Sequence, residues 1–67
     1  MKTEKILISS LLWRKHPTNE KYFYCNFNNE MYILRINNFP EEPLVTLING
    51  FEIFDLDEMP PGWNFEG

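Results

Sequence analysis

The chain has 67 residues, a formal net charge of -4 and an aromatic share of 16%. This length allows one small domain, and the single cysteine, Cys25, excludes a disulfide within the chain. One cysteine and one histidine, His16, cannot complete a four-ligand zinc site. Aromatic side chains, each able to bury roughly 150–250 Å², therefore have to supply most of the core, unless a second copy of the chain completes it.

The N-terminal segment has a mixed pattern. Ile6, Ile8 and Leu12 alternate as in a strand, whereas Ile8 and Leu12 are also spaced as in a helix. Ser9-Ser10 and the β-branched isoleucines favour a strand that ends before Pro17. The alternative is a helix over residues 5–15.

Two strands are predicted at residues 21–27 and 31–36, because both runs are rich in aromatic and β-branched side chains. Asn28-Asn29 lies between them and tolerates the positive φ values of a two-residue hairpin loop. The resulting pairs are Phe27–Glu30, Cys25–Tyr32 and Phe23–Leu34 on the core face, and Asn26–Met31, Tyr24–Ile33 and Tyr22–Arg35 on the other face.

A second hairpin is predicted after a proline-containing connection at residues 37–43. Residues 44–48 and 51–56 form its strands, and Asn49-Gly50 is a strong signal for the two-residue loop. That loop pairs Ile48 with Phe51, Thr46 with Ile53, and Val45 with Phe54. Apolar side chains occur on both faces of this hairpin, which indicates burial on more than one side.

The segment from Met59 to Trp63 contains Pro60-Pro61 and cannot form a helix or the interior of a strand. We expect an extended strap that returns Trp63 to the sheet; the alternative is an exposed polyproline ligand. The sequence thus predicts one all-β domain over residues 1–67, an antiparallel meander of four to five strands in a curled or partly closed sheet. The alternative is an α+β fold with an N-terminal helix on a four-stranded sheet.

Charge is distributed unevenly along the chain. Six basic and three acidic residues lie in positions 1–35, giving +3, and seven acidic residues with no base follow, giving -7. The basic residues are too few and the acidic half too negative for a nucleic-acid partner. Cys25 is expected to be a core thiol and His16 an exposed loop residue, so no catalytic residue, metal ligand or cofactor site is predicted.

We therefore expect a non-enzymatic protein-binding module whose acidic C-terminal half docks a basic partner. The candidate residues are the acids and one aromatic anchor on the outer face: Glu41, Glu42, Asp55, Asp57, Glu58 and Trp63. One alternative is a homo-oligomeric β protein, such as a homodimer, that buries its exposed face against a copy of itself. The other is a carboxylate-based metal site or enzyme, although no calcium loop frames the acids.

A cytoplasmic location is predicted from three features. A lone thiol suits a reducing compartment. The N-terminal apolar stretch lacks a small-residue cleavage site, and no apolar run approaches the ~20 residues that span a bilayer.

The stretch from Tyr32 to Ile48 contains Leu34-Arg35, Asn37 and Phe39-Pro40-Glu41-Glu42-Pro43-Leu44, and a Pro-Gly-Trp tail follows. In these residues the chain resembles a group of short, uncharacterised bacterial proteins. The resemblance covers about the last half of the chain. It implies a bacterial origin and carries no activity, ligand or site.

Overall fold

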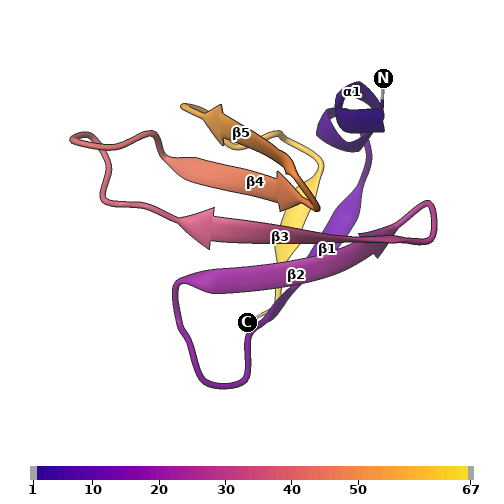
Figure 1. Ribbon diagram of the computed structural model, residues 1–67, viewed down its shortest axis with the longest axis horizontal. Coiled ribbons are helices and arrows are strands. Elements are labelled where there is room, and N and C mark those ends of the chain that lie inside the picture. The colour runs from indigo at the N-terminus through magenta and orange to yellow at the C-terminus, as the bar shows by residue number, and fades with distance from the viewer. Residues whose placement is uncertain (1, 67) are drawn as a thin grey trace.

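A computed structural model describes residues 2–66, with side chains from Lys5 onward. These residues form one short helix and six strands, and the strands make a single mixed sheet in the order β5-β4-β3-β2-β1-β6 (Figure 1). The elements are α1 (Lys2–Leu7), β1 (Leu11–Lys15), β2 (Tyr22–Phe27), β3 (Glu30–Ile36), β4 (Val45–Asn49), β5 (Glu52–Leu56) and β6 (Trp63–Phe65). The predicted all-β class is confirmed. The sheet is not closed, and β5 and β6 are its edges.

The β2–β3 hairpin forms in the predicted register. All six predicted pairs are present, from Phe27 with Glu30 at the turn to Tyr22 with Arg35 at the far end. Asn28 and Asn29 have φ values of 53° and 64°. A type I′ loop requires positive φ at both central residues, and asparagine adopts it more readily than most residues.

The predicted β4–β5 turn is wrong by one residue. Asn49 pairs with Glu52, so Gly50-Phe51 forms the loop in place of Asn49-Gly50. Gly50 has a φ of 60°, and glycine at the first central position is typical of a type II′ turn. Ile48 therefore pairs with Ile53, and Thr46 pairs with Asp55. Because each partner moves by two residues, every side chain stays on its predicted face.

β1 to β5 form an antiparallel meander, as predicted. The strap after β5 returns Trp63 to the sheet, as predicted, but it also adds a sixth strand, β6, that was not predicted. β6 lies parallel to β1, with Leu11 opposite Trp63 and Trp13 opposite Phe65. The backbone N–H of Leu11 donates to the Gly62 carbonyl at 3.0 Å. This parallel partner was not predicted, because a three-residue strand is too short to show a period.

The N-terminal segment divides into a helix and a strand. The continuous strand predicted there is wrong over α1, and the alternative helix over residues 5–15 is wrong over β1. Ser9 ends the helix, because its hydroxyl donates to the Lys5 carbonyl at 2.6 Å and its N–H to the Ile6 carbonyl at 3.3 Å. Ile6 is fully buried and Ile8 is exposed. Among the described side chains of α1, Ile6 belongs to the core and Leu7 packs against it.

The core lies on one face of the sheet, where Ile6 of α1 packs with side chains from the strands. Trp13 and Trp63 meet edge to face with their ring centroids 5.0 Å apart, and Phe23 meets Phe65 in the same way at 5.0 Å. The buried side chains are Ile6, Trp13, Cys25, Tyr32, Leu34, Val45, Leu47 and Trp63. The opposite face, which we call the outer face, carries Tyr24, Ile33, Thr46, Ile48, Ile53 and Asp55.

Candidate functional site

Acidic side chains gather at one end of the sheet. Val45, the first residue of β4, pairs with Leu56, the last residue of β5. The loop that precedes β4 and the segment that follows β5 therefore reach the same end (Figure 1). We call this surface the acidic end, and its members are all exposed: Glu41, Glu42, Asp55, Asp57 and Glu58.

No member of the acidic end forms an ion pair within the described side chains, residues 5–66; the ion pair found there joins Arg14 to Glu66 at 3.6 Å. Two of the acids make local hydrogen bonds. Glu42 Oε1 accepts from the Asn38 N–H at 3.0 Å, and Asp55 Oδ1 accepts from the Thr46 hydroxyl at 2.8 Å. Among the described side chains, the carboxylates of this end therefore have no basic group within ion-pair distance.

Asp55 is held in place by a chain of side-chain hydrogen bonds across three strands. Arg35 Nη1 donates to Asn37 Oδ1 at 2.6 Å, and Asn37 Nδ2 donates to Thr46 Oγ1 at 2.7 Å. The Thr46 hydroxyl then donates to Asp55. This series of hydrogen bonds uses one of the two carboxylate oxygens of Asp55 and leaves the other without a side-chain partner among the described residues.

An apolar row of side chains crosses the outer face beside these hydrogen-bonded side chains. Tyr24, Ile33, Ile48 and Ile53 are successive partners on β2, β3, β4 and β5. Ile53 is 64% exposed and neighbouring Met31 is 54% exposed. A hollow of about 600 Å³ lies over the β2–β3–β4 part of the row, beside the 16–19 turn. Apolar character on both faces was predicted for the β4–β5 hairpin, and the structure extends it to β2 and β3.

Trp63 does not belong to any exposed surface. Its placement on the outer face as an anchor is wrong, because the side chain is only 6% exposed and packs on Trp13. Its Nε1–H donates to the buried Ile6 carbonyl at 3.0 Å. The strap explains this burial, because a segment that returns an indole to the sheet buries the ring against it.

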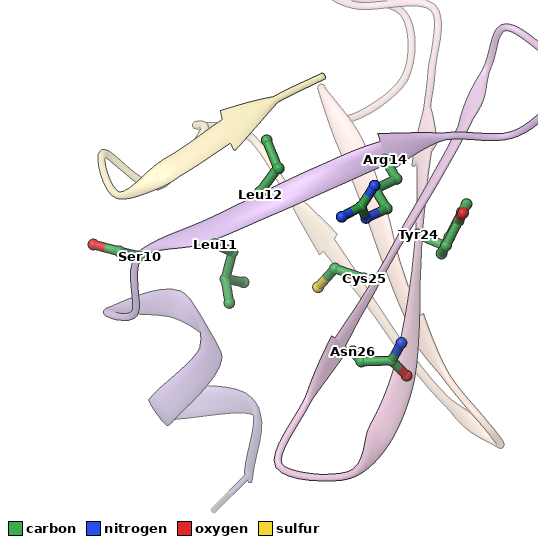
Figure 2. Close-up of a pocket in the computed structure, with 7 residues that line it drawn as sticks. All are labelled: Ser10, Leu11, Leu12, Arg14, Tyr24, Cys25 and Asn26. Atoms are coloured by element: carbon green, nitrogen blue, oxygen red, sulfur yellow. The ribbon is translucent and has the colours of Figure 1, made fainter. Parts of the chain in front are cut away.

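A second hollow, of about 590 Å³, opens where β1 and β2 separate (Figure 2). The two strands pair at Arg14–Tyr24 and Lys15–Phe23, and beyond these pairs β1 turns to β6. Figure 2 shows Leu11 and the Cys25 sulfur pointing into the space between the strands. No sequence signal identified this cleft, because it depends on where β1 leaves β2.

Cys25 and His16 lie in different surroundings, one buried and one exposed. Burial raises the pKa of the Cys25 thiol from 9.0 to about 11, so the neutral form is favoured at the floor of the cleft. His16 is exposed, as predicted, and its Nδ1 accepts the N–H groups of Thr18 and Asn19 at 3.2 and 3.0 Å. Among the described residues, no group of three or more His, Cys, Asp or Glu side chains is arranged to hold a metal ion.

Comparisons of the chain with protein-family models, curated proteins and solved structures find no match. The resemblance of the Tyr32–Ile48 stretch to short bacterial proteins therefore stays a prediction. Within residues 2–66, no helix has the length and apolar character that crossing a bilayer requires.

Proposed function

We propose that the chain is a non-enzymatic protein-binding module that docks a basic partner on its acidic end. The observation that carries the proposal is five exposed carboxylates with no ion pair from the described residues, at one end of a folded sheet. Positive charge on a partner would supply the missing complement and steer its approach. A cytoplasmic location fits the buried, neutral thiol of Cys25.

The distribution of charge supports a directional contact. Residues beyond Arg35 carry seven acids and no base, and the chain folds so that five of the seven lie at one end. The ordered Asp55 carboxylate, which the Thr46 hydroxyl holds at 2.8 Å, offers a fixed acceptor for a lysine or arginine of the partner.

The test compares two single charge reversals. Glu58→Lys alters the acidic end, whereas Glu20→Lys makes the same change in an exposed turn far along the chain. Wild type and both variants are immobilised and used to capture proteins from the native host's lysate at low and moderate salt. A basic protein that binds wild type and Glu20→Lys but not Glu58→Lys, and that salt releases, would support the proposal. Identical captured sets for all three proteins would refute it.

A second candidate function is self-association through the outer face. The observation that favours it is the exposed apolar row that ends at Ile53. Ile53→Asp would place a charge in that row, and light scattering over a concentration series would report dissociation of any dimer. A constant monomer mass for wild type would remove this candidate.

A further inference from the structure

We propose that β5 is a strand-addition site, on which an extended basic segment of a partner protein extends the sheet. The inference rests on the proposed function and gives it a binding mode. The observation that supports it is the open edge of β5, and the acidic charge around that edge indicates that the partner segment is basic. Figure 1 shows β5 at the margin of the sheet, where β4 is its strand neighbour on one side.

The register shows which backbone groups of β5 are available. Asn49 and Glu52 close the two-residue loop, and the closing pair of such a loop is hydrogen-bonded. Bonded and non-bonded pairs alternate along an antiparallel ladder. Glu52, Phe54 and Leu56 therefore bond to β4, while the N–H and C=O groups of Ile53 and Asp55 point away from the sheet.

The side chains of β5 define what an added strand should carry. Ile53 and Asp55 lie on the outer face, and Asp57 and Glu58 follow at the acidic end. Phe54 and Leu56 lie on the core face and are half-buried at the edge. A complementary strand would place basic side chains beside the acids and apolar side chains beside Phe54 and Leu56. Alternation of basic and apolar residues is therefore the expected motif.

The charge of β5 also decides against a second copy of the chain at this edge. The segment from Glu52 to Glu58 has four acids and no base. Two such segments side by side would set eight negative charges along one strand pair, and like charges across a pair are destabilising. Acidic side chains on an edge thus prevent self-pairing, whereas a basic strand meets no such repulsion.

The probe is a ten-residue peptide of alternating valine and lysine, and its control alternates proline and lysine. Both have the same charge, but proline lacks the N–H donor and fixes φ at about -65°, so the control cannot continue a ladder. Titration is followed by the amide resonances of isotope-labelled protein. We expect the Val-Lys peptide to bind at least tenfold more tightly, with peptide contacts at the Ile53 and Asp55 amides.

A protein variant tests the same edge. Ile53→Pro removes an outward N–H and leaves the ladder to β4 intact, since proline is tolerated at such edge positions. Ile53→Val retains the N–H and is its control. The remaining amide spectrum reports whether Ile53→Pro is folded. We expect Ile53→Pro to lower affinity for the Val-Lys peptide to that of the Pro-Lys peptide, and Ile53→Val to change it less than twofold.

Three outcomes would overturn strand addition. They are equal affinities for the two peptides, Val-Lys contacts away from β5, and no binding at millimolar concentrations. If both peptides bind equally and Glu58→Lys weakens both, charge docking stands and strand addition falls. If the lysate capture fails while Val-Lys binds wild type and Glu58→Lys equally at β5, the acidic end is not the docking surface.

Discussion

The two buried tryptophans that join β6 to β1 offer a matched test of the packing. Trp13 is fully buried and Trp63 is 6% exposed, and their rings contact each other. They differ in one respect. The Nε1–H of Trp63 donates to the Ile6 carbonyl, whereas the buried Nε1 of Trp13 has no hydrogen-bond partner among the described residues. We expect Trp63→Phe to lower the free energy of unfolding more than Trp13→Phe does.

The expected loss of unfolding free energy has one contribution that both substitutions share and one that differs between them. Both remove part of an indole from the core, a loss of about 1–3 kcal/mol on the scale of other large-to-small core changes. Trp63→Phe also removes a hydrogen bond worth about 0.5–1.5 kcal/mol, although the Ile6 carbonyl keeps the Ser9 N–H at 3.3 Å. Trp13→Phe removes an unpaired donor, which recovers part of its desolvation cost. The expected difference is about 1–2 kcal/mol.

Urea unfolding followed by far-ultraviolet circular dichroism measures both variants, because fluorescence would lose a reporter in each. A 67-residue domain has about 3–10 kcal/mol of stability, so the difference is measurable. Phe51→Leu is the control, since this loop side chain is fully exposed and its change should stay within about 0.5 kcal/mol. Equal losses for the two tryptophan variants, or a greater loss for Trp13→Phe, would refute the role assigned to the Trp63–Ile6 hydrogen bond.

Three further predictions concern the turn, the strap and the thiol. Gly50→Val should lower the free energy of unfolding by about 1–2 kcal/mol, because Gly50 has a φ of 60°. Gly50→Asn should lower it less in the same thermal melt, and an unchanged melting temperature for Gly50→Val would contradict the assigned turn. Gly62→Ala should weaken the pairing of β6 with β1, since an added Cβ would lie 2.8 Å from the Ser9 carbonyl oxygen; unaltered hydrogen exchange at Leu11 would contradict this. The raised pKa of Cys25 stabilises the fold fully below pH 9, and this contribution should be lost as pH rises to about 11. Cys25→Ala should show a smaller loss of stability over the same range, and an identical loss would contradict the assignment.

The sequence was most informative where a short loop fixed the pairing. Asn28-Asn29 determined six correct pairs in β2 and β3, because a two-residue loop leaves one register. Asn49-Gly50 predicted the second hairpin but not its loop residues. A loop at Gly50-Phe51 keeps Gly50 at a positive-φ position and keeps every side chain on its face, so the hydrophobic pattern could not distinguish the two.

The contacts of β1 could not be derived from local patterns. The pairing of Leu11 with Trp63 joins residues far apart in the chain through a three-residue strand, which is too short to show a period. The cleft beside Cys25 is a consequence of that pairing, since it opens where β1 turns from β2 to β6. The acidic end was predictable, because β4–β5 pairing brings residues 41–42 and 57–58 together in either register.

β5 joins the two surfaces that support the competing functions. Ile53 belongs to the exposed apolar row, and Asp55, two residues away on the same face, belongs to the acidic end. The two modes of association respond differently to salt. Charge docking on an exposed surface weakens as ionic strength rises, whereas apolar burial between copies is unchanged or strengthened by sulfate. A partner lost and a dimer retained at high sulfate would therefore assign the two functions to separate halves of one strand.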